Sequence, residues 1–461
     1  MESVFSHHRR TAVILSGEGT AAAYLAGVLN SLTDAGVRVD CVVGKGAGAL
    51  VAALAAIDSG SRLVGRDGLL ARMSSRAPWR VRPIYAASAG LLAVSFAIFV
   101  SPLLFGVLAL LTVPFAALGR FFTDAPSQSL VAPWLGYLLD RAEPLYLRSM
   151  VVPLIALCAL WLLWLFRGIF RERRLPRAPE PFDLSRFSGW LTSNLWKAVR
   201  GTSTDELPRD RKALGDAYRK LLAGSLGQRG FMELVFYALD TDAGQEVPFT
   251  LLKERYSKKL RASRSSRSER SAEPIDLTHD SGGLFLDALM AALSPPGLVP
   301  SVPLRLPLGS SHGGEVHRFS GSLLASGSAF ADAVAAGAEQ VVFVSSSVPG
   351  DAATGNPLER VTEAALRRSL ADQLSEANRF PDLPVFLIRP DKQRLSPYEI
   401  AGRAQIGGER LGLAALYAHG RRDALRLFVE PVLSEGGPAE HEPPPTGAAF
   451  QPDLPVGPQE L

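Results

Sequence analysis

The sequence predicts an α/β protein with a mainly parallel sheet and an inserted membrane hairpin. Three observations predict this class: short β-rich runs alternate with helix-forming segments, two long segments lack any charge, and a glycine-rich loop follows each of the first two expected strands. The chain has 461 residues, of which 47% are hydrophobic, so it is long enough to bury a large core.

The expected elements alternate along the chain. A strand over 11–15 is followed by a helix over 21–35 and a second strand over 37–43. Later apolar runs predict strands over 231–239, 341–344 and 384–388, and a last helical pattern covers 400–417. Strands separated by helices favour a largely parallel sheet that is covered on both faces.

Two segments have the length and composition of membrane spans. Pro83 to Gly119 gives 37 residues without a charge, and Ser149 to Phe166 gives 18. Stretches of about 20 apolar residues cross a bilayer, and both runs are apolar on every face, which argues against a buried core helix. The first run is longer than one span requires, so the sequence leaves open whether it crosses once or re-enters.

Arginine residues set the expected orientation of these spans. The flanks 66–82 and 167–177 each carry five arginines against one acid, while 119–148 between the spans is balanced. The positive-inside rule therefore predicts a two-span hairpin with both flanks on the cytoplasmic side. We expect the protein in the inner (cytoplasmic) membrane, with its main domain in the cytoplasm.

Charge and cysteine content exclude several classes of protein. Lysine and arginine number 49 against 45 acidic residues, a net charge of +4, which argues against nucleic-acid binding. The two cysteines, Cys41 and Cys158, provide neither a disulfide framework nor a zinc site. The seven histidines form no metal-binding motif, so we expect no metal and no cofactor.

Two polar segments fall outside the expected elements. Residues 253–270 hold eight basic and two acidic side chains, and are predicted to be a basic linker that is either solvated or attracted to an anionic inner leaflet. Residues 434–461 hold seven prolines, five acids and no lysine or arginine. We therefore expect 431–461 to be a disordered tail.

Glycine-rich loops end the first two expected strands. The first is Ser16-Gly17-Glu18-Gly19-Thr20, and the second is Gly44-Lys45-Gly46-Ala47-Gly48. Glycines at these places let backbone segments approach closely and leave N–H groups to bind an anion at a helix N-terminus. A dinucleotide-binding fold is the rival interpretation, but neither loop has the full G-x-G-x-x-G spacing.

These residues resemble the patatin-like phospholipases. The segment 12–29, with Gly17, Glu18 and Gly19, is similar to that family's oxyanion segment and first helix, and 44–54 is similar to its nucleophile elbow. Further similarity covers 239–249, 291–300 and 319–344 in the same order. The resemblance implies a three-layer patatin-like fold whose two parts are 1–75 and 176–430, with 76–175 as the inserted membrane hairpin.

The positions that carry the family's chemistry differ in this sequence. The resemblance places the serine nucleophile at Gly46 and the catalytic aspartate at Ser320. Glycine has no oxygen to acylate, and a serine hydroxyl is not a base near neutral pH. Glu18 stands where the family has a glycine, and Ala21 and Ala22 replace a basic residue and a glycine. A carboxylate in that loop would repel a developing oxyanion.

The sequence therefore predicts a membrane-anchored, catalytically inactive homologue of a lipid acyl hydrolase. We expect it to bind membrane lipid or fatty acid, or to act as a scaffold at the cytoplasmic membrane face, with protein partners unknown. Two alternatives stay open. One is an active hydrolase with an unconventional nucleophile such as Ser16, Ser320 or Ser322, and the other is a structural interaction protein with a closed cleft.

Other side chains are candidates to occupy or border the empty site. Glu18 and Lys45 are expected either to form an ion pair there or to point into water. Lys45 and the loop N–H groups could also hold a lipid phosphate or a fatty carboxylate. His312 and His317 precede Ser320, and either border the site or belong to a surface loop.

Overall fold

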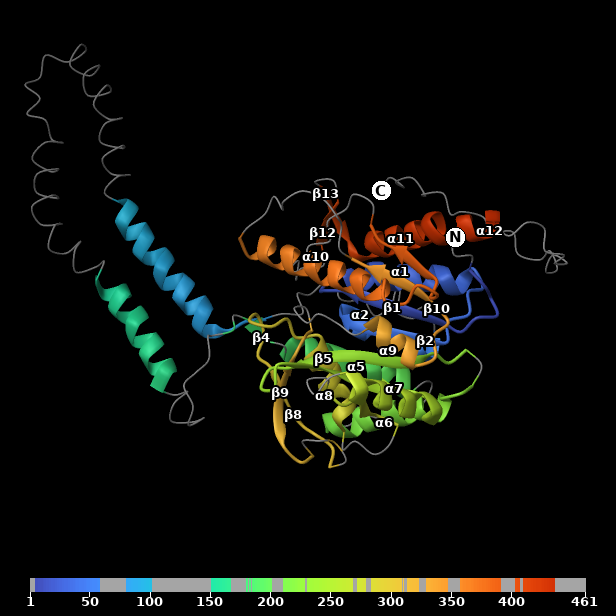
Figure 1. Cartoon of the computed structure of the whole chain (residues 1–461). Helices are drawn as coiled ribbons and strands as arrows, with labels where there is room; N and C mark the ends of the chain where they lie inside the picture. The colour runs from blue at the N-terminus through green and yellow to red at the C-terminus, as the bar shows by residue number, and fades with distance from the viewer. Residues whose placement is uncertain are drawn as a thin grey trace, which may run out of the picture.

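The structure is a computed structural model with an α/β body and two apolar helices that project from it (Figure 1). The body confirms the expected α/β class. The described residues are 5–58, 80–101, 151–166, 180, 182–183, 185–200, 210–228, 230–267, 272–278, 283–308, 310, 313–322, 329–346, 357–390, 403–406 and 409–435.

The body is built on one mixed, mostly parallel sheet. Its strand order is β11 (Val385–Ile388), β10 (Gln340–Ser345), β1 (Thr11–Gly17), β2 (Cys41–Gly46), β5 (Glu233–Asp240), β6 (Gln245–Leu251) and β7 (Ile275–Asp276). From β11 to β5 every neighbouring pair is parallel, whereas β6 is antiparallel to β5. A hairpin of β8 (Val302–Arg305) and β9 (Val316–Ser320) joins the sheet through β9, which pairs with β5.

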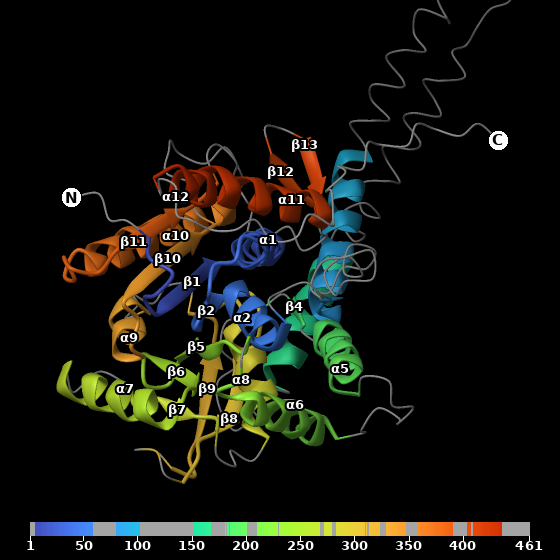
Figure 2. The same cartoon turned by 90° about the vertical axis from the view of Figure 1, so that its right-hand side faces the viewer.

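Helices cover both faces of the sheet, so the central strands are buried on both sides (Figure 2). One face packs against α1 (Ala21–Asp34), α2 (Ala47–Asp58), α5 (Ser185–Arg200), α6 (Arg211–Ser225) and α8 (Leu284–Ala292). The other packs against α7 (Glu254–Arg267), α9 (Ala329–Ala335) and α10 (Pro357–Ala377). Along β1, Val13 and Leu15 face the first layer and Ala12 and Ile14 the second, which is the alternation of a strand.

Helix α7 corrects one expectation from the sequence. Residues 253–270 were predicted to be a basic linker, but Glu254–Arg267 is a helix that packs on the sheet. Tyr256 and Leu260 are buried in the core on this face. Arg264 is buried too, since it forms an ion pair of 2.7 Å with Asp332 in α9. A basic segment can therefore belong to the core when its few apolar residues and one paired arginine share a helical face.

The C-terminal part of the body departs from the predicted helix over 400–417. Residues 403–412 form a hairpin of β12 (Arg403–Ile406) and β13 (Glu409–Gly412), and helix α11 (Leu413–Ala424) begins only after it. The sequence Gly407-Gly408 lies between the two strands, and paired glycines disfavour a continuous helix. After α11 the chain continues as a π-helical turn, Leu425–Val429, and as α12 (Glu430–Glu435).

Helix α11 packs closely on α1 at two glycines. A side chain at Gly27 would overlap the Tyr417 carbonyl, and one at Gly420 would overlap the Tyr24 carbonyl. The Tyr24 hydroxyl donates a hydrogen bond of 3.0 Å to Asp423 Oδ2 at this crossing. Helix α11 is thereby fixed against α1.

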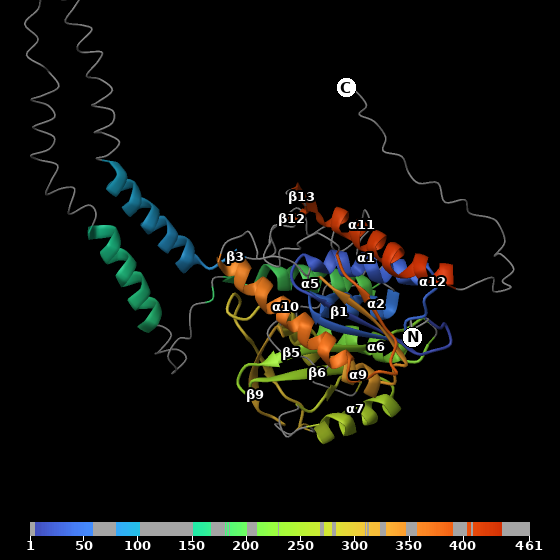
Figure 3. The ribbon, with the colours of Figure 1, turned by 45° about the horizontal axis from the view of Figure 1, so that its top comes forward.

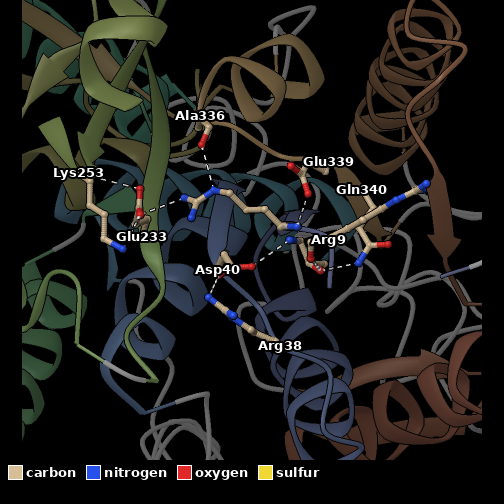
Figure 4. Close-up of polar contacts among 10 residues, drawn as sticks. Arg9, Arg38, Asp40, Glu233, Lys253, Ala336, Glu339 and Gln340 are labelled. Atoms are coloured by element: carbon tan, nitrogen blue, oxygen red, sulfur yellow. Dashed lines mark hydrogen bonds and ion pairs between the residues drawn. The ribbon is translucent and has the colours of Figure 1, made fainter. Parts of the chain in front are cut away.

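Charged groups join the strands at their amino ends, opposite the glycine-rich turns. Figure 4 shows Lys253 beside Glu233 and Arg38 beside Asp40; the ion-pair distances are 3.8 and 3.0 Å. Glu233 also forms an ion pair of 3.0 Å with Arg10. The charged side chains at this edge of the sheet therefore form ion pairs with one another, and these pairs have a structural role.

The two apolar helices lie side by side away from the body (Figure 3). Among the described residues only the helix Pro83–Ser101 is long and apolar enough to cross a membrane, and the apolar helix Val151–Phe166 is shorter. The Trp161 indole donates a hydrogen bond of 3.1 Å to Ser88 Oγ, so the helices contact each other. The rest of the expected hairpin lies outside the described residues, and the second span has no helix of spanning length within them.

A small ribbon joins these helices to the body. Strand β3 (Arg80–Val81) precedes the first apolar helix and pairs antiparallel with β4 (Phe182–Asp183). The Phe182 amide donates to the Leu298 carbonyl at 3.0 Å, in the segment that follows α8. The base of the helix pair is therefore held against the α/β body.

Candidate functional site

The site begins at the turn between β2 and α2, where Gly46 has a φ of +56°. This left-handed conformation favours glycine. The neighbouring glycines are required by close packing, because a side chain at Gly44 would overlap the α2 backbone and one at Gly48 would overlap the Leu15 carbonyl. The three glycines together form a tight strand-to-helix turn at the carboxyl edge of the sheet.

The Glu18 carboxyl group lies over this turn. A side chain built at residue 46 would overlap the Glu18 carboxylate and the Gly17 carbonyl. Glu18 is buried, and burial raises the pKa of its carboxyl to about 8. The volume that a residue 46 side chain would need is therefore filled by a carboxyl group that is mostly protonated at pH 7.

The register of the sheet brings Ser320 to the same place. Strand β6 pairs along one edge of β5, so β2 and β9 share the other edge. Gly44 of β2 lies opposite Phe236 of β5, and Ser320 of β9 lies opposite Leu239. Because β2 is parallel to β5 and β9 is antiparallel to it, the two strands end facing each other. Gly46 and Ser320 thus lie at neighbouring strand ends.

Among the described residues, no group is hydrogen-bonded to the Ser320 hydroxyl to activate it. Its side chain is buried, and Ser320 Oγ has no hydrogen-bond partner among the described residues. The same holds for Ser322 Oγ. The adjacent amide of Gly321 donates to the Ser294 carbonyl at 2.6 Å, which fixes the chain after β9. An unpaired hydroxyl is a weak nucleophile, because a neighbouring base must take its proton.

Lys45 does not pair with Glu18, which corrects the expected ion pair. Its Nζ lies 2.9 Å from Glu246 Oε1 in β6 and 5.2 Å from the centre of the Tyr237 ring. Lys45 follows Cys41 and Val43 in the alternation of β2, and both face the layer of α7, α9 and α10. The Lys45 charge is therefore paired on the face of the sheet covered by α7, α9 and α10, and it is not available to an anion at the turn between β2 and α2.

His317 is held by two carboxylates. Its Nδ1 lies 2.6 Å from Asp240 Oδ2 and its Nε2 lies 3.0 Å from Glu315 Oε2. These hydrogen bonds, first with Glu315 and then with Asp240, raise the pKa of His317. Both ring nitrogens are engaged, so His317 is not a base for Ser320 in this arrangement. His312 lies outside the described residues.

The remaining predicted residues lie in the two loops. Gly17 ends β1 and is paired with Gly46 across the sheet, while Gly19 has a φ of +56° just before α1. Ala21 and Ala22 open α1, and Ala47 opens α2. The sequence thus located the two loops, but the position of Glu18 over Gly46 is visible only in three dimensions.

A buried polar network near Lys45 was missed by the sequence analysis. It joins Tyr237, whose hydroxyl donates to Asp332 at 2.8 Å, to the Arg264–Asp332 ion pair. The sequence gives no signal for this network, because Asp332 stands alone in a run of small and apolar residues and Glu246 follows a polar turn in which an acidic residue is expected to be exposed. Within the described parts of the chain, no group of three or more His, Cys, Asp or Glu side chains is arranged to hold a metal ion.

Comparison with known proteins does not assign a family. No family model matches the chain, and no curated protein matches it. Among solved structures, VipD from Legionella pneumophila is similar at 11% identity and a TM-score of 0.32, covering 94% of this chain and 68% of that chain. A similarity at this level carries no argument about fold or function.

Proposed function

We propose that this chain is a membrane-anchored, patatin-like protein that does not hydrolyse lipid. In this proposal it keeps the frame of a lipid acyl hydrolase and binds membrane lipid or fatty acid, or serves as a scaffold, at the cytoplasmic membrane face. The observation that carries the proposal is the Glu18 carboxyl group lying in the space that a nucleophile at residue 46 would occupy.

Two features of the turn support loss of catalysis. The turn between β2 and α2 keeps a left-handed central residue, which is the backbone form that a nucleophile elbow requires. Glycine adopts this form without the strain of about 1–3 kcal/mol that a side chain would add. The turn can therefore persist after its chemistry is lost, and Glu18 then fills the vacated volume.

The acid position supports the same conclusion. Ser320 lies at the strand end that faces the turn, where the proposal requires the former aspartate. Its hydroxyl cannot accept a proton near pH 7, and no base partners it in the described residues. An active hydrolase that uses Ser320 or Ser16 would need a base that these contacts do not supply.

Exposed apolar side chains support membrane anchoring. Most of the large hydrophobic side chains exposed on the described structure belong to the two projecting helices, including Phe96, Leu163 and Val152. Water does not favour such a surface, whereas a bilayer does. The contact of Trp161 with Ser88 supports a hairpin, in which both helices would enter the membrane together.

Labelling with a serine-reactive fluorophosphonate tests the loss of catalysis. The purified full-length protein in detergent is expected to show no labelling and no turnover of a fluorogenic acyl ester. A rebuilt variant with Glu18→Gly, Gly46→Ser and Ser320→Asp is expected to gain labelling, because it clears the volume and restores both groups. The matched control carries Gly46→Ala in place of Gly46→Ser. Wild-type labelling that disappears in Ser320→Ala or Ser16→Ala would overturn the proposal.

Membrane anchoring and lipid binding have separate tests. The full-length protein should remain in the membrane pellet after alkaline carbonate extraction, and a Phe96→Asp/Leu92→Asp variant should be released. Mass spectrometry of the protein extracted in mild detergent should then find bound lipid or fatty acid in excess of that on the rebuilt active variant. Complete release of the wild type by carbonate contradicts the anchor, and absence of bound lipid favours the scaffold.

A further inference from the structure

The two apolar helices, Pro83–Ser101 and Val151–Phe166, contact each other along a narrow seam and leave their outer faces uncovered. In the first helix the buried and half-buried positions of the seam recur every three or four residues: Ile84, Ser88, Leu91, Ser95 and Ile98. On the outer faces of the two helices, Phe96 and Leu163 are each 68% exposed. The pair therefore presents an apolar outer surface that the body does not cover (Figure 1).

The hydroxyl groups of the first helix are satisfied within the pair. Ser88, Ser95 and Ser101 each donate a hydrogen bond to a backbone carbonyl of the preceding turn, at 2.7, 2.9 and 2.8 Å. Ser88 also accepts the hydrogen bond of 3.1 Å from the Trp161 indole. Beyond Tyr85 this helix carries no other polar side chain. Its side chains therefore need no hydrogen bond from water, and they can lie in hydrocarbon.

Three aromatic side chains, which we call the aromatic belt, gather at the ends of the helices nearest the body (Figure 1). The ring centres of Tyr85 and Trp161 are 5.8 Å apart and those of Trp161 and Trp164 are 5.6 Å apart, both edge to face. Tyr85 lies in the first turn of the first helix and the two tryptophans in the last two turns of the second, so all three meet at one level. Tyrosine and tryptophan combine an apolar ring with a polar tip, and they concentrate where a bilayer meets water.

Positive charge begins just outside the aromatic belt on both segments of the chain. Arg82 directly precedes the first helix, and Arg167 directly follows the second. The flanks 66–82 and 167–177 each carry five arginines against one acid. Anionic phospholipid headgroups attract such flanks, whereas the same flanks on a second copy of the chain would repel them. The charge therefore favours phospholipid over a second copy as the partner of the helix pair.

We propose that the aromatic belt lies in the phospholipid headgroup layer of the leaflet nearest the body, so that the α/β body rests directly on the membrane. From Tyr85 to Ser101 the helix rises about 24 Å, which is most of the roughly 30 Å thickness of the hydrocarbon. Strand β3 comes just before this helix, and its partner β4 is tied to the body by the bond of 3.0 Å from the Phe182 amide to the Leu298 carbonyl. The inference rests on the membrane anchoring proposed above, and it adds the depth of the anchor and the lipid groups that it contacts.

Spin labels at two equally exposed positions measure this depth. The full-length protein, in vesicles of phosphatidylcholine and phosphatidylglycerol, carries one label at Leu163→Cys or at Phe96→Cys in a Cys158→Ser background. Cys41 is buried and should stay unlabelled, which Cys158→Ser alone checks. Leu163 lies between the belt tryptophans, whereas Phe96 lies about 16 Å along the helix from Tyr85. Relative to oxygen, a water-soluble nickel complex should reach the label at 96 about tenfold less than the label at 163, because hydrocarbon excludes polar solutes.

The two positions are a matched pair, since Leu163 and Phe96 are each 68% exposed and would be equally accessible in water. High nickel access at both positions contradicts the belt and the membrane anchoring together. Low nickel access with high oxygen access at both positions keeps the anchor and refutes the belt, because position 163 would then lie in hydrocarbon. Exclusion of nickel and oxygen from both positions would show that protein, such as a second copy, covers the helices, and it would refute the lipid contact.

Replacing the indole groups tests whether the aromatic side chains set the depth. Trp161→Leu/Trp164→Leu keeps apolar side chains and removes their polar tips, so the label at 163 should move into hydrocarbon and lose nickel access. Phe166→Leu is the matched control, because it removes a nearby ring that has no polar atom and should leave nickel access at 163 unchanged. Unchanged access in the double tryptophan variant would refute the role of the belt.

Discussion

Replacing Glu18 with glutamine should make the protein more stable, by an amount that grows with pH. Burial raises the Glu18 pKa from 4.5 to about 8 in the folded state. Between these values the folded protein holds a proton that the unfolded chain has released, so its stability falls as pH rises. From pH 5 to pH 8 this one group costs the wild type roughly 3–4 kcal/mol, because each pKa unit corresponds to about 1.4 kcal/mol. Glutamine keeps the shape of the protonated acid and has no such dependence.

Urea unfolding followed by circular dichroism measures this difference. The wild type and Glu18→Gln are compared at pH 5, 6, 7 and 8 in the same detergent, and the gap in unfolding free energy should widen by roughly 3–4 kcal/mol in favour of the variant. Glu254→Gln, an exposed glutamate on α7, is the control and should show no widening gap. Parallel curves for the wild type and Glu18→Gln would contradict this prediction, since they would show that Glu18 is not buried over Gly46.

Three further predictions concern the packing of the body. Gly46→Ala should lower the free energy of unfolding by about 2 kcal/mol or more. Adding Glu18→Ala should recover only the part of this loss that is due to the overlap of the two side chains, because the positive φ at residue 46 remains strained. A double-mutant cycle measured by urea unfolding tests this. Asp332→Asn should lower the unfolding free energy by about 3–5 kcal/mol, because it leaves the buried Arg264 without its counter-ion, whereas Asp287→Asn in α8 should cost far less. Burial raises the pKa of the Cys41 thiol, so iodoacetamide should not modify it in folded Cys158→Ser protein at pH 8; rapid modification would contradict the buried position.

Elements with strong local patterns could be predicted from the sequence alone. The strands that contain 11–15, 341–344 and 385–388 were expected within a few residues, because buried parallel strands are continuous apolar runs. The glycine-rich turn around Gly46 was also expected, since its glycines are needed by local backbone geometry. The helix expected over 400–417 was wrong in its first half, where two strands form a hairpin. A helical pattern of apolar residues does not show that these residues pair with each other as strands.

The sheet-forming segments, the glycine turns and the charge-free helices can be identified from the sequence, as can the glycine at position 46 and the serine at position 320. Which side chains meet is visible only in the folded protein: Glu18 lies over Gly46, Lys45 pairs with Glu246, and Arg264 pairs with Asp332. The periodicity of apolar residues indicates which face of its own helix or strand a residue lies on. An ion pair or an overlap depends in addition on elements that are distant in the chain. The sequence alone therefore does not distinguish an exposed charged residue from one that is buried with a partner.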